Sequence, residues 1–230
     1  IREQISNLKS SNIEEAVKID KSLKELDQVM DFIDEKVVAG DIYTAISALE
    51  FVETTVTDIA HLYLSFLDQE GITNVNLLGF SLGGWIAAEM VAMCPHIFDK
   101  LILVDAAGIK PEVGEIAEIM MVSDEEVRKL MFFNPDQITG YEEEFNRDVT
   151  SEEQTTNWNN REMFSRLGWR PYLHNPKLLP YLGRVKTSSL IIWGRQDAII
   201  PLNCADLYHK RLRNSTLHVI DDCGHSPHIE

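Results

Sequence analysis

The chain has 230 residues, enough for one sizeable core or for one core with a small helical appendage. Apolar residues make up 44% and charged residues 25%, the usual balance of a globular protein in water. The formal net charge is -16, from 37 acidic and 21 basic residues. Such a field repels phosphate backbones and anionic lipid, so we expect neither a nucleic-acid partner nor a membrane partner.

The sequence contains no apolar run near the roughly 18 residues of a membrane span. Its N-terminal stretch also lacks the apolar core of an export signal. Cys94, Cys204 and Cys223 are odd in number and have no metal-ligand spacing. We therefore expect reduced, buried thiols and a cytoplasmic location.

Residues 1–52 have a helical pattern throughout and form the first predicted domain. Gly40 suits the left-handed position at a helix end, and Asp41 suits the N-cap of a following helix. The helical stepping then resumes over residues 42–66, so we predict an antiparallel hairpin that turns at Gly40. Whether the threonine-rich segment 54–57 breaks the second helix stays open, because β-branched residues form helices poorly. The apolar seam of the first helix has three- and four-residue steps: Ala16, Ile19, Leu23, Leu26, Met30, Ile33 and Val37.

From about residue 53 to residue 230, short apolar segments alternate with helical ones. This alternation predicts βαβ units and a parallel sheet. A helix is expected from residue 82 to about 93. Each predicted strand is continuous and β-branched, as strands covered on both faces should be. The strands are expected at residues 74–80, 100–105, 189–194 and 215–220.

Residues from about 111 to 182 form an insertion with helical patterns and no convincing strand. We expect helices at 115–121, 124–133 and 157–167. A helical insertion between two strands of a parallel sheet is typical of a cap over the carboxyl edge, where such folds bind ligands. Its large apolar residues would either pack within the cap or favour apolar substrates: Met120, Met121, Met131, Phe132, Phe133, Trp158 and Trp169.

The segment Gly79-Phe80-Ser81-Leu82-Gly83 matches the pattern G-x-S-x-G between a predicted strand and a predicted helix. A serine in this context sits on a sharp turn, and the flanking glycines keep Cβ atoms out of the bend. We predict a nucleophile elbow with Ser81 as the nucleophile. The Leu82 N–H, at the helix start, is expected to donate to an oxyanion. Trp85, one turn further on, is a candidate substrate contact or a packing residue.

A serine hydroxyl needs a base, and the base needs an orienting carboxylate. Asp197 follows the predicted strand 189–194, and His225 follows the predicted strand 215–220. The carboxyl ends of parallel strands meet at one edge of a sheet, and the chain order Ser, Asp, His is that of this architecture. We predict Ser81 as nucleophile, His225 as base and Asp197 as orienting acid.

Several other residues compete for these roles. Asp105 also ends a predicted strand and is an alternative acid, whereas Asp221 and Asp222 share the loop of the predicted base. His228 is an alternative base. His225 and His228 have no third metal ligand nearby in the sequence, so we predict no metal.

Four blocks of sequence resemble the α/β-hydrolase superfamily, in its esterase and C–C-bond hydrolase branch, over residues 53–230. They are GFSLGGW around Ser81, LILVDAAG from Leu101, LIIWGRQDAIIP around Asp197 and CGHSPHIE around His225. The resemblance implies a serine hydrolase that acts on small apolar esters or related carbonyl compounds through an acyl-enzyme. It implies no cofactor.

Members of that superfamily usually begin with several strands and a His-Gly loop that supplies a second oxyanion N–H. We expect both to be absent here, since His61 is followed by Leu62. Activity would then be weak, and the alternative is an inactive hydrolase-fold protein that binds a ligand or partner. The hairpin 1–52 and the edge at strand 74–80 are candidate surfaces for a homodimer.

Overall fold

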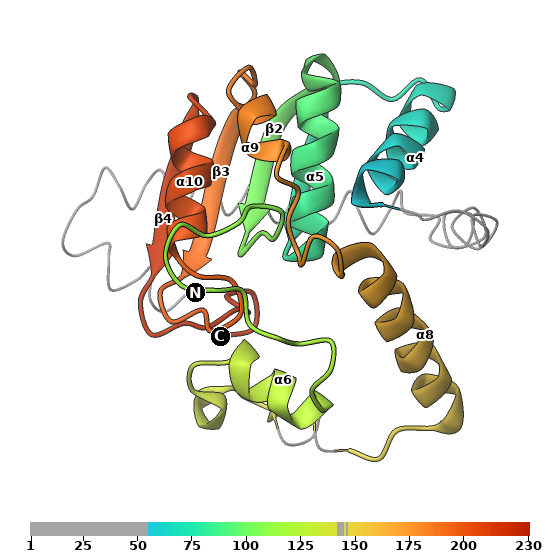
Figure 1. The fold of residues 1–230 in the computed structure, drawn as a ribbon, viewed down its shortest axis with the longest axis vertical. Helices are drawn as coiled ribbons and strands as arrows, with labels where there is room; N and C mark the ends of the chain where they lie inside the picture. The colour runs from blue at the N-terminus through green and yellow to red at the C-terminus, as the bar shows by residue number, and fades with distance from the viewer. Residues whose placement is uncertain (1–54, 142–144, 146) are drawn as a thin grey trace. The chain divides into compact units, whose positions relative to one another are not determined.

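A computed structural model describes residues 55–141, 145 and 147–230 (Figure 1). The predicted hairpin of residues 1–52, with its turn at Gly40, lies outside the described residues. The first described helix is α4, Val56–Gln69. Thr55 caps it with extended backbone: its hydroxyl accepts from the Asp58 N–H at 3.2 Å, and the Asp58 carboxylate accepts from the Thr55 N–H at 2.8 Å. A helix therefore begins at Val56, within the threonine-rich segment, and the part of the predicted stepping before Thr55 lies outside the described residues.

The described sheet has four parallel strands in the order β1-β2-β3-β4. Phe80 at the end of β1 pairs with Val104, which in turn pairs with Ile192. This register brings the carboxyl ends of the strands to one edge. The prediction of a parallel sheet is confirmed, and each strand lies within two residues of its expected bounds: β1 Val75–Phe80, β2 Phe98–Val104, β3 Ser188–Gly194 and β4 Ser215–Ile220.

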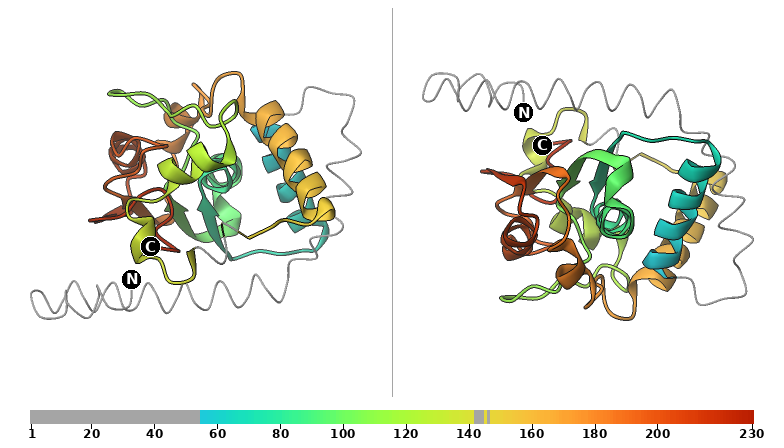
Figure 2. Two further views of the ribbon diagram at one scale, coloured as in Figure 1. Left: turned by 90° about the horizontal axis from the view of Figure 1, so that it is seen from below. Right: turned by 90° about the horizontal axis from the view of Figure 1, so that it is seen from above.

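Helices α5 and α10 pack on the sheet, α9 packs against both of them, and α4 packs against α5. Helix α5, Leu82–Met93, contacts α4, β1, β2 and α9, while α10, Asn203–Arg211, contacts α9, β3 and β4. Figures 1 and 2 show α5, α9 and α10 on the same face of the sheet. Helix α9, Leu178–Leu182, follows the insertion, and the short helix η1, Pro95–Ile97, leads into β2. Within the part of the chain that the structure describes, no helix is long and apolar enough to cross a membrane.

The sequence of α5 explains its position. The helix is apolar on nearly all sides, and most of its residues from Gly84 to Ala92 are buried. A helix of that composition is stable only when neighbours surround it. Polar tips in the core are satisfied by backbone carbonyls: the Trp193 indole N–H donates to Ile200 at 3.2 Å, and the Tyr208 hydroxyl donates to Ala107 at 2.5 Å.

The insertion between β2 and β3 contains the helices α6, η2 and α8. Helix α6, Asp124–Met131, lies beyond the carboxyl ends of the strands (Figure 1) and matches the prediction. A short helix, η2, spans Pro135–Gln137, and α8 spans Ser151–Gly168, longer than expected. Ser123 and Thr150 cap α6 and α8 through reciprocal bonds with a glutamate three residues on.

The helix predicted over residues 115–121 is wrong, because this segment is irregular. Its backbone groups are satisfied from elsewhere: the Ala117 N–H donates to Ile199 O at 2.9 Å, and the Ile119 N–H donates to the Tyr172 hydroxyl at 2.9 Å. The Glu118 carboxylate accepts from the Met120 N–H at 2.6 Å. Tertiary partners thus replace the bonds that a helix would have made.

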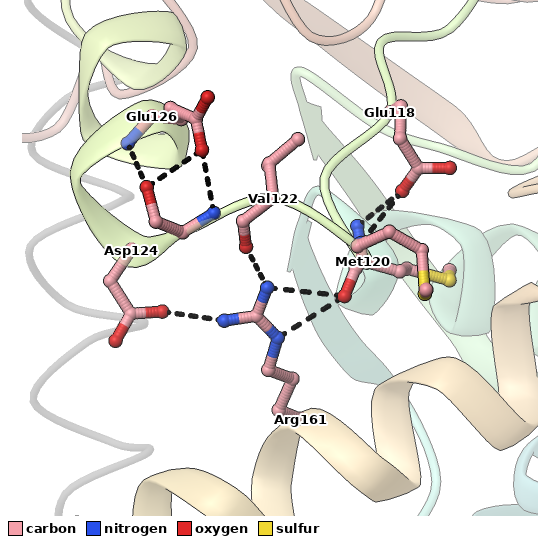
Figure 3. A network of polar contacts seen from close by, with 8 residues as sticks. Glu118, Met120, Val122, Asp124, Glu126 and Arg161 are labelled. Atoms are coloured by element: carbon pink, nitrogen blue, oxygen red, sulfur yellow. Dashed lines mark hydrogen bonds and ion pairs between the residues drawn. The ribbon is translucent and has the colours of Figure 1, made fainter.

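Arg161 on α8 ties that helix to the segment before α6 (Figure 3). Its guanidinium donates to the Met120 carbonyl from Nε at 3.2 Å and from Nη2 at 3.1 Å, and Nη2 also donates to the Val122 carbonyl. Nη1 pairs with the Asp124 carboxylate at 2.8 Å. One planar group therefore joins three points of the insertion, which the fork geometry of arginine allows.

We expect Arg161→Lys to destabilise the protein by about 1–3 kcal/mol, because a lysine ammonium cannot span these acceptors. Urea unfolding gives the loss, and hydrogen exchange should rise at residues 118–124. The matched control is Arg166→Lys on the same helix, where the ion pair with Glu162 is largely exposed. This variant should change the free energy of unfolding by less than about 0.5 kcal/mol. Equal losses in the two variants would contradict this role for Arg161.

Candidate active site

Ser81 lies at the turn between β1 and α5 with φ 50° and ψ -116°. A non-glycine residue reaches this region only under constraint. Here the constraint is a set of backbone hydrogen bonds: the Ser81 N–H donates to Val104 O at 2.9 Å, and its carbonyl accepts from Ala107 N at 3.0 Å and Trp85 N at 3.2 Å. The turn holds the half-buried Ser81 hydroxyl at the carboxyl edge of the sheet.

Close contacts require glycine at position 79 of the motif and at position 84, directly after it. A Cβ at Gly79 would lie 2.3 Å from the Gly83 carbonyl oxygen, and a Cβ at Gly84 would lie 2.5 Å from the Ala106 Cβ. At Gly83, by contrast, an added Cβ meets nothing within 4 Å. The glycine at position 84 thus lets α5 pack directly on the segment after β2.

The structure brings the three predicted residues together in series. His225 Nε2 lies 3.0 Å from Ser81 Oγ, and His225 Nδ1 lies 2.8 Å from Asp197 Oδ2. The side chains of His225 and Asp197 are 4% and 0% exposed, so water does not compete for this contact. A carboxylate at Nδ1 fixes the tautomer with the proton on Nδ1, which leaves the Nε2 lone pair free to accept the serine proton.

The loop after β3 holds Asp197 in place. Asp197 Oδ1 accepts hydrogen bonds from the Ile199 N–H at 2.8 Å and the Ile200 N–H at 2.9 Å. Together with His225, these donors give the carboxylate three hydrogen bonds and fix its orientation. The side chain therefore presents a fixed negative charge to the imidazole.

The loops that carry Asp197 and His225 are fastened to each other. A Cβ at Gly194 would lie 1.8 Å from the Gly224 carbonyl oxygen, so the two backbones touch. The Gln196 N–H donates to Cys223 O at 2.9 Å, and the Cys223 N–H donates to the Gln196 side chain at 3.0 Å. The insertion also takes part, because the His225 N–H donates to the Met131 carbonyl at 2.7 Å.

The competing residues lie in different surroundings. Asp221 is exposed and forms an ion pair with Arg195. Asp222 is exposed in a left-handed turn. The His228 ring lies against Phe80 with centroids 4.7 Å apart, and burial together with the nearby His225 lowers the pKa of His228. Asp105 alone is buried beside the three residues in series.

Leu82 and Trp85 lie on α5, one turn apart. Leu82 is the first residue of the helix, and N–H groups of a first turn have no acceptor within their own helix. Trp85 is only 4% exposed, and its indole N–H donates to the Glu89 carboxylate at 3.1 Å. Glu89, which the sequence analysis did not single out, also accepts from the Asn175 amide at 2.7 Å. Trp85 thus packs in the core, and its buried partner ties α5 to the end of the insertion.

The large apolar residues of the insertion divide into two groups. Met120 and Phe132 are buried and pack within the protein. Met131 is partly buried. The remaining four present large apolar surface to solvent: Met121, Phe133, Trp158 and Trp169.

One group of potential metal ligands occurs among the described residues. An oxygen of Asp105, an oxygen of Asp197 and a ring nitrogen of His225 lie within 4.8 Å of one another. The Asp197 and His225 atoms in this region already share a hydrogen bond of 2.8 Å. Asp105 therefore lies beside a pair that is already hydrogen-bonded.

Comparison with known proteins identifies the family. A profile of the alpha/beta hydrolase family matches residues 40–230, and the chain belongs to this family. The resemblance expected from the sequence is therefore confirmed.

Two curated relatives are 2-hydroxy-6-oxononadienedioate/2-hydroxy-6-oxononatrienedioate hydrolases. The enzyme of Klebsiella pneumoniae is 28% identical over 191 residues, and that of Pseudomonas putida is 26% identical over 180 residues. Each match covers 72% of this chain and 61% of the relative. The chain thus spans about three fifths of the length of these relatives.

Solved structures give the same fold. The 2-hydroxy-6-oxo-6-phenylhexa-2,4-dienoate hydrolase of Rhodococcus sp. strain RHA1 is 25% identical with a TM-score of 0.57, over 76% of this chain and 66% of that one. A meta-cleavage product hydrolase of Pseudomonas fluorescens IP01 has a TM-score of 0.61 over the same shares at 19% identity, which supports the fold alone.

We expect Gly84→Ala to destabilise the protein by about 1–3 kcal/mol, since its Cβ would overlap the rigid Ala106. The matched control is Gly83→Ala in the same helical turn, which has open space and should be neutral or stabilising by up to about 1 kcal/mol. Urea unfolding of both variants measures the difference. If Gly84→Ala proved as stable as Gly83→Ala, the close packing of α5 on the segment after β2 would be disproved.

Proposed function

We propose that this chain is a serine hydrolase that acts on carboxylic esters or related carbonyl compounds through an acyl-enzyme on Ser81. The observation that carries the proposal is the series of hydrogen bonds from Ser81 through His225 to Asp197, at 3.0 Å and 2.8 Å. Such a series is the arrangement that activates a hydroxyl nucleophile. The three residues follow the ends of three parallel strands, and the chain belongs to the alpha/beta hydrolase family. Both facts add support.

In the acylation step, Ser81 Oγ attacks the substrate carbonyl carbon while its proton passes to His225 Nε2. The Asp197 carboxylate stabilises the imidazolium that forms. As the tetrahedral intermediate collapses, the bond to the leaving group breaks and His225 returns the proton to it. Water then attacks the acyl-enzyme by the same route, with His225 as base, and Ser81 is released.

The Leu82 N–H is the donor that we assign to the oxyanion. It opens α5, a helix of 12 residues, so the positive end of the helix dipole adds to the field at the same point. A single donor of this kind is worth about 10²–10³-fold in rate. The acyl oxygen would therefore lie over the start of α5.

The substrate we propose is neutral and apolar. The names of the curated relatives specify dienedioates, which carry two carboxylates. This chain has a net charge of -16, a field that disfavours a doubly negative ligand. In addition, the guanidinium of Arg161 in the insertion already serves three protein acceptors and is not free to bind a substrate carboxylate.

The proposed cytoplasmic location rests on buried thiols: burial raises the pKa of both Cys204 and Cys223 to about 12, so they are unreactive and stay reduced.

A fluorophosphonate probe tests the nucleophile directly. We expect labelling of the parent protein at Ser81, and loss of labelling in Ser81→Ala together with a fall of at least about 10³-fold in hydrolysis of activated short-chain aryl esters. The matched control is Ser65→Ala, an exposed serine on the preceding helix α4, which should label like the parent. Unchanged labelling of Ser81→Ala would mean another nucleophile, and a folded parent that never labels would favour the binding-protein alternative.

The proposed preference for neutral substrates predicts a dependence on salt. An uncharged aryl ester should be hydrolysed faster than an ester of the same size with one added carboxylate. That advantage should shrink between low salt and about 0.5 M salt, because counterions screen the acidic field. Steady-state kcat/KM for the two esters at each ionic strength gives the ratio. A ratio below one, or one that does not change with salt, would argue against the role of charge.

A further inference from the structure

Asp105 occupies a buried position directly after β2. It is 0% exposed and has a positive φ of 42°. Its N–H donates to Ile192 O at 3.1 Å, and its Oδ1 accepts from the Gly194 N–H at 2.9 Å. One part of its role is therefore to fasten the end of β2 to the end of β3, the strand that leads to Asp197.

The other oxygen of the Asp105 carboxyl group, Oδ2, makes no hydrogen bond of this kind within the described part of the chain. Oδ2 is buried, and no hydrogen-bond donor among the described residues reaches it. An oxygen of the Asp105 carboxyl, an oxygen of Asp197 and a ring nitrogen of His225 lie within 4.8 Å of one another. A buried carboxylate oxygen without a donor is costly, and it is costlier beside a second carboxylate.

The hydrogen bonds decide which carboxyl group carries the charge. Asp197 accepts from the Ile199 N–H, the Ile200 N–H and His225, at 2.8 to 2.9 Å. Asp105 accepts from one N–H only. Two like charges this close and this deeply buried do not both persist. The group with three donors keeps its negative charge, and the group with one takes the proton.

We propose that Asp105 is a protonated positioning residue, which holds its Oδ2 proton toward Asp197 so that the two carboxyl groups present a single negative charge to His225. The role rests on the proposed function of Ser81, Asp197 and His225. It also has a consequence for the pair: if Asp197 loses its charge, the like charge that keeps Asp105 neutral disappears. Asp105 can then ionise and supply the carboxylate.

The electrostatic surroundings of Asp105 agree with this assignment. Burial, and after it the charge of Asp197, raise the pKa of Asp105 to about 9, against the opposing effect of the Gly194 N–H. The Glu230 carboxylate acts in the same direction. The other titratable groups that face the pair are His225 and the Cys204 and Cys223 thiols, and both thiols are neutral because burial raises their pKa to about 12.

The protonation state can be tested without reference to activity. Infrared difference spectra at pH 7 should show a protonated-carboxyl C=O band in the parent that is absent from Asp105→Asn. Asparagine has the same shape, accepts from Gly194 and donates to Asp197. The control is Asp99→Asn on the exposed side of β2, which should leave the band unchanged. A parent spectrum without the band would overturn the proposal, whether or not the protein is an active hydrolase.

The pH dependence of stability gives a second independent reading. In the unfolded chain Asp105 loses its proton near its ordinary pKa of 3.8, whereas the folded protein keeps the proton until about pH 9. Stability should therefore fall as the pH rises between these values, because the folded state binds more protons. Asp105→Asn lacks this contribution. The melting temperature of the variant should therefore rise relative to that of the parent as the pH rises. Parallel curves for the two proteins would overturn the assignment.

Rates of fluorophosphonate labelling then test the positioning role. Asp105→Asn should stay within about threefold of the parent, whereas Asp105→Leu, which removes both polar contacts, should fall by about 10-fold or more. Asp197→Asn should lose less than the ~10⁴-fold expected for a lone orienting acid, and the double variant Asp105→Asn/Asp197→Asn should lose more than the product of the single losses. If the double variant matched Asp197→Asn, Asp105 would be structural only. A parent that fails to label would count against the proposed function, and the spectra and melting curves would still decide the state of Asp105.

Discussion

The parallel register of β1 to β4 is the constraint on which the other features depend. Because neighbouring strands end side by side, the three chain segments that leave β1, β3 and β4 emerge at one edge within reach of each other. The segments after β3 and β4 also touch through their backbones. Gly194 contacts Gly224 so closely that a Cβ at position 194 would overlap the Gly224 carbonyl. Hydrogen bonds of 2.8 Å and 3.0 Å through His225 are the result of that approach. The site is thus a product of strand pairing more than of any single loop.

Local sequence patterns foretold the parts of the fold that depend on local forces. The strands are continuous and β-branched, and α5 follows a motif whose glycines permit the sharp turn before it, so both were expected within two residues. Ser81, Asp197 and His225 were chosen because they follow strand ends in the order that the fold requires. The geometry of the described residues then placed them in one line, which the sequence could suggest only through the assumed topology.

What the sequence missed depends on contacts between distant residues. Residues 115–121 have a helical composition, yet Ile199 and Tyr172, more than fifty residues away, bind their backbone groups. Glu89 looked like an ordinary helix residue, and only packing shows it buried between Trp85 and Asn175. Asp105 was noted as a rival to Asp197 for one role. The structure instead puts both carboxyl groups in the same buried space, a relation that no spacing in the chain displays.

The hydrogen bond from the His225 N–H to the Met131 carbonyl couples the insertion to the proton-transfer residue. Phe133, two residues further on, donates its N–H to Glu230 at 2.9 Å, and Glu230 also accepts from Gly224 at 2.8 Å. A displacement of α6 would therefore break bonds to the loop of His225, at about 1 kcal/mol for each bond lost. The position of the imidazole thus depends on a helix of the insertion as well as on the strand that precedes His225.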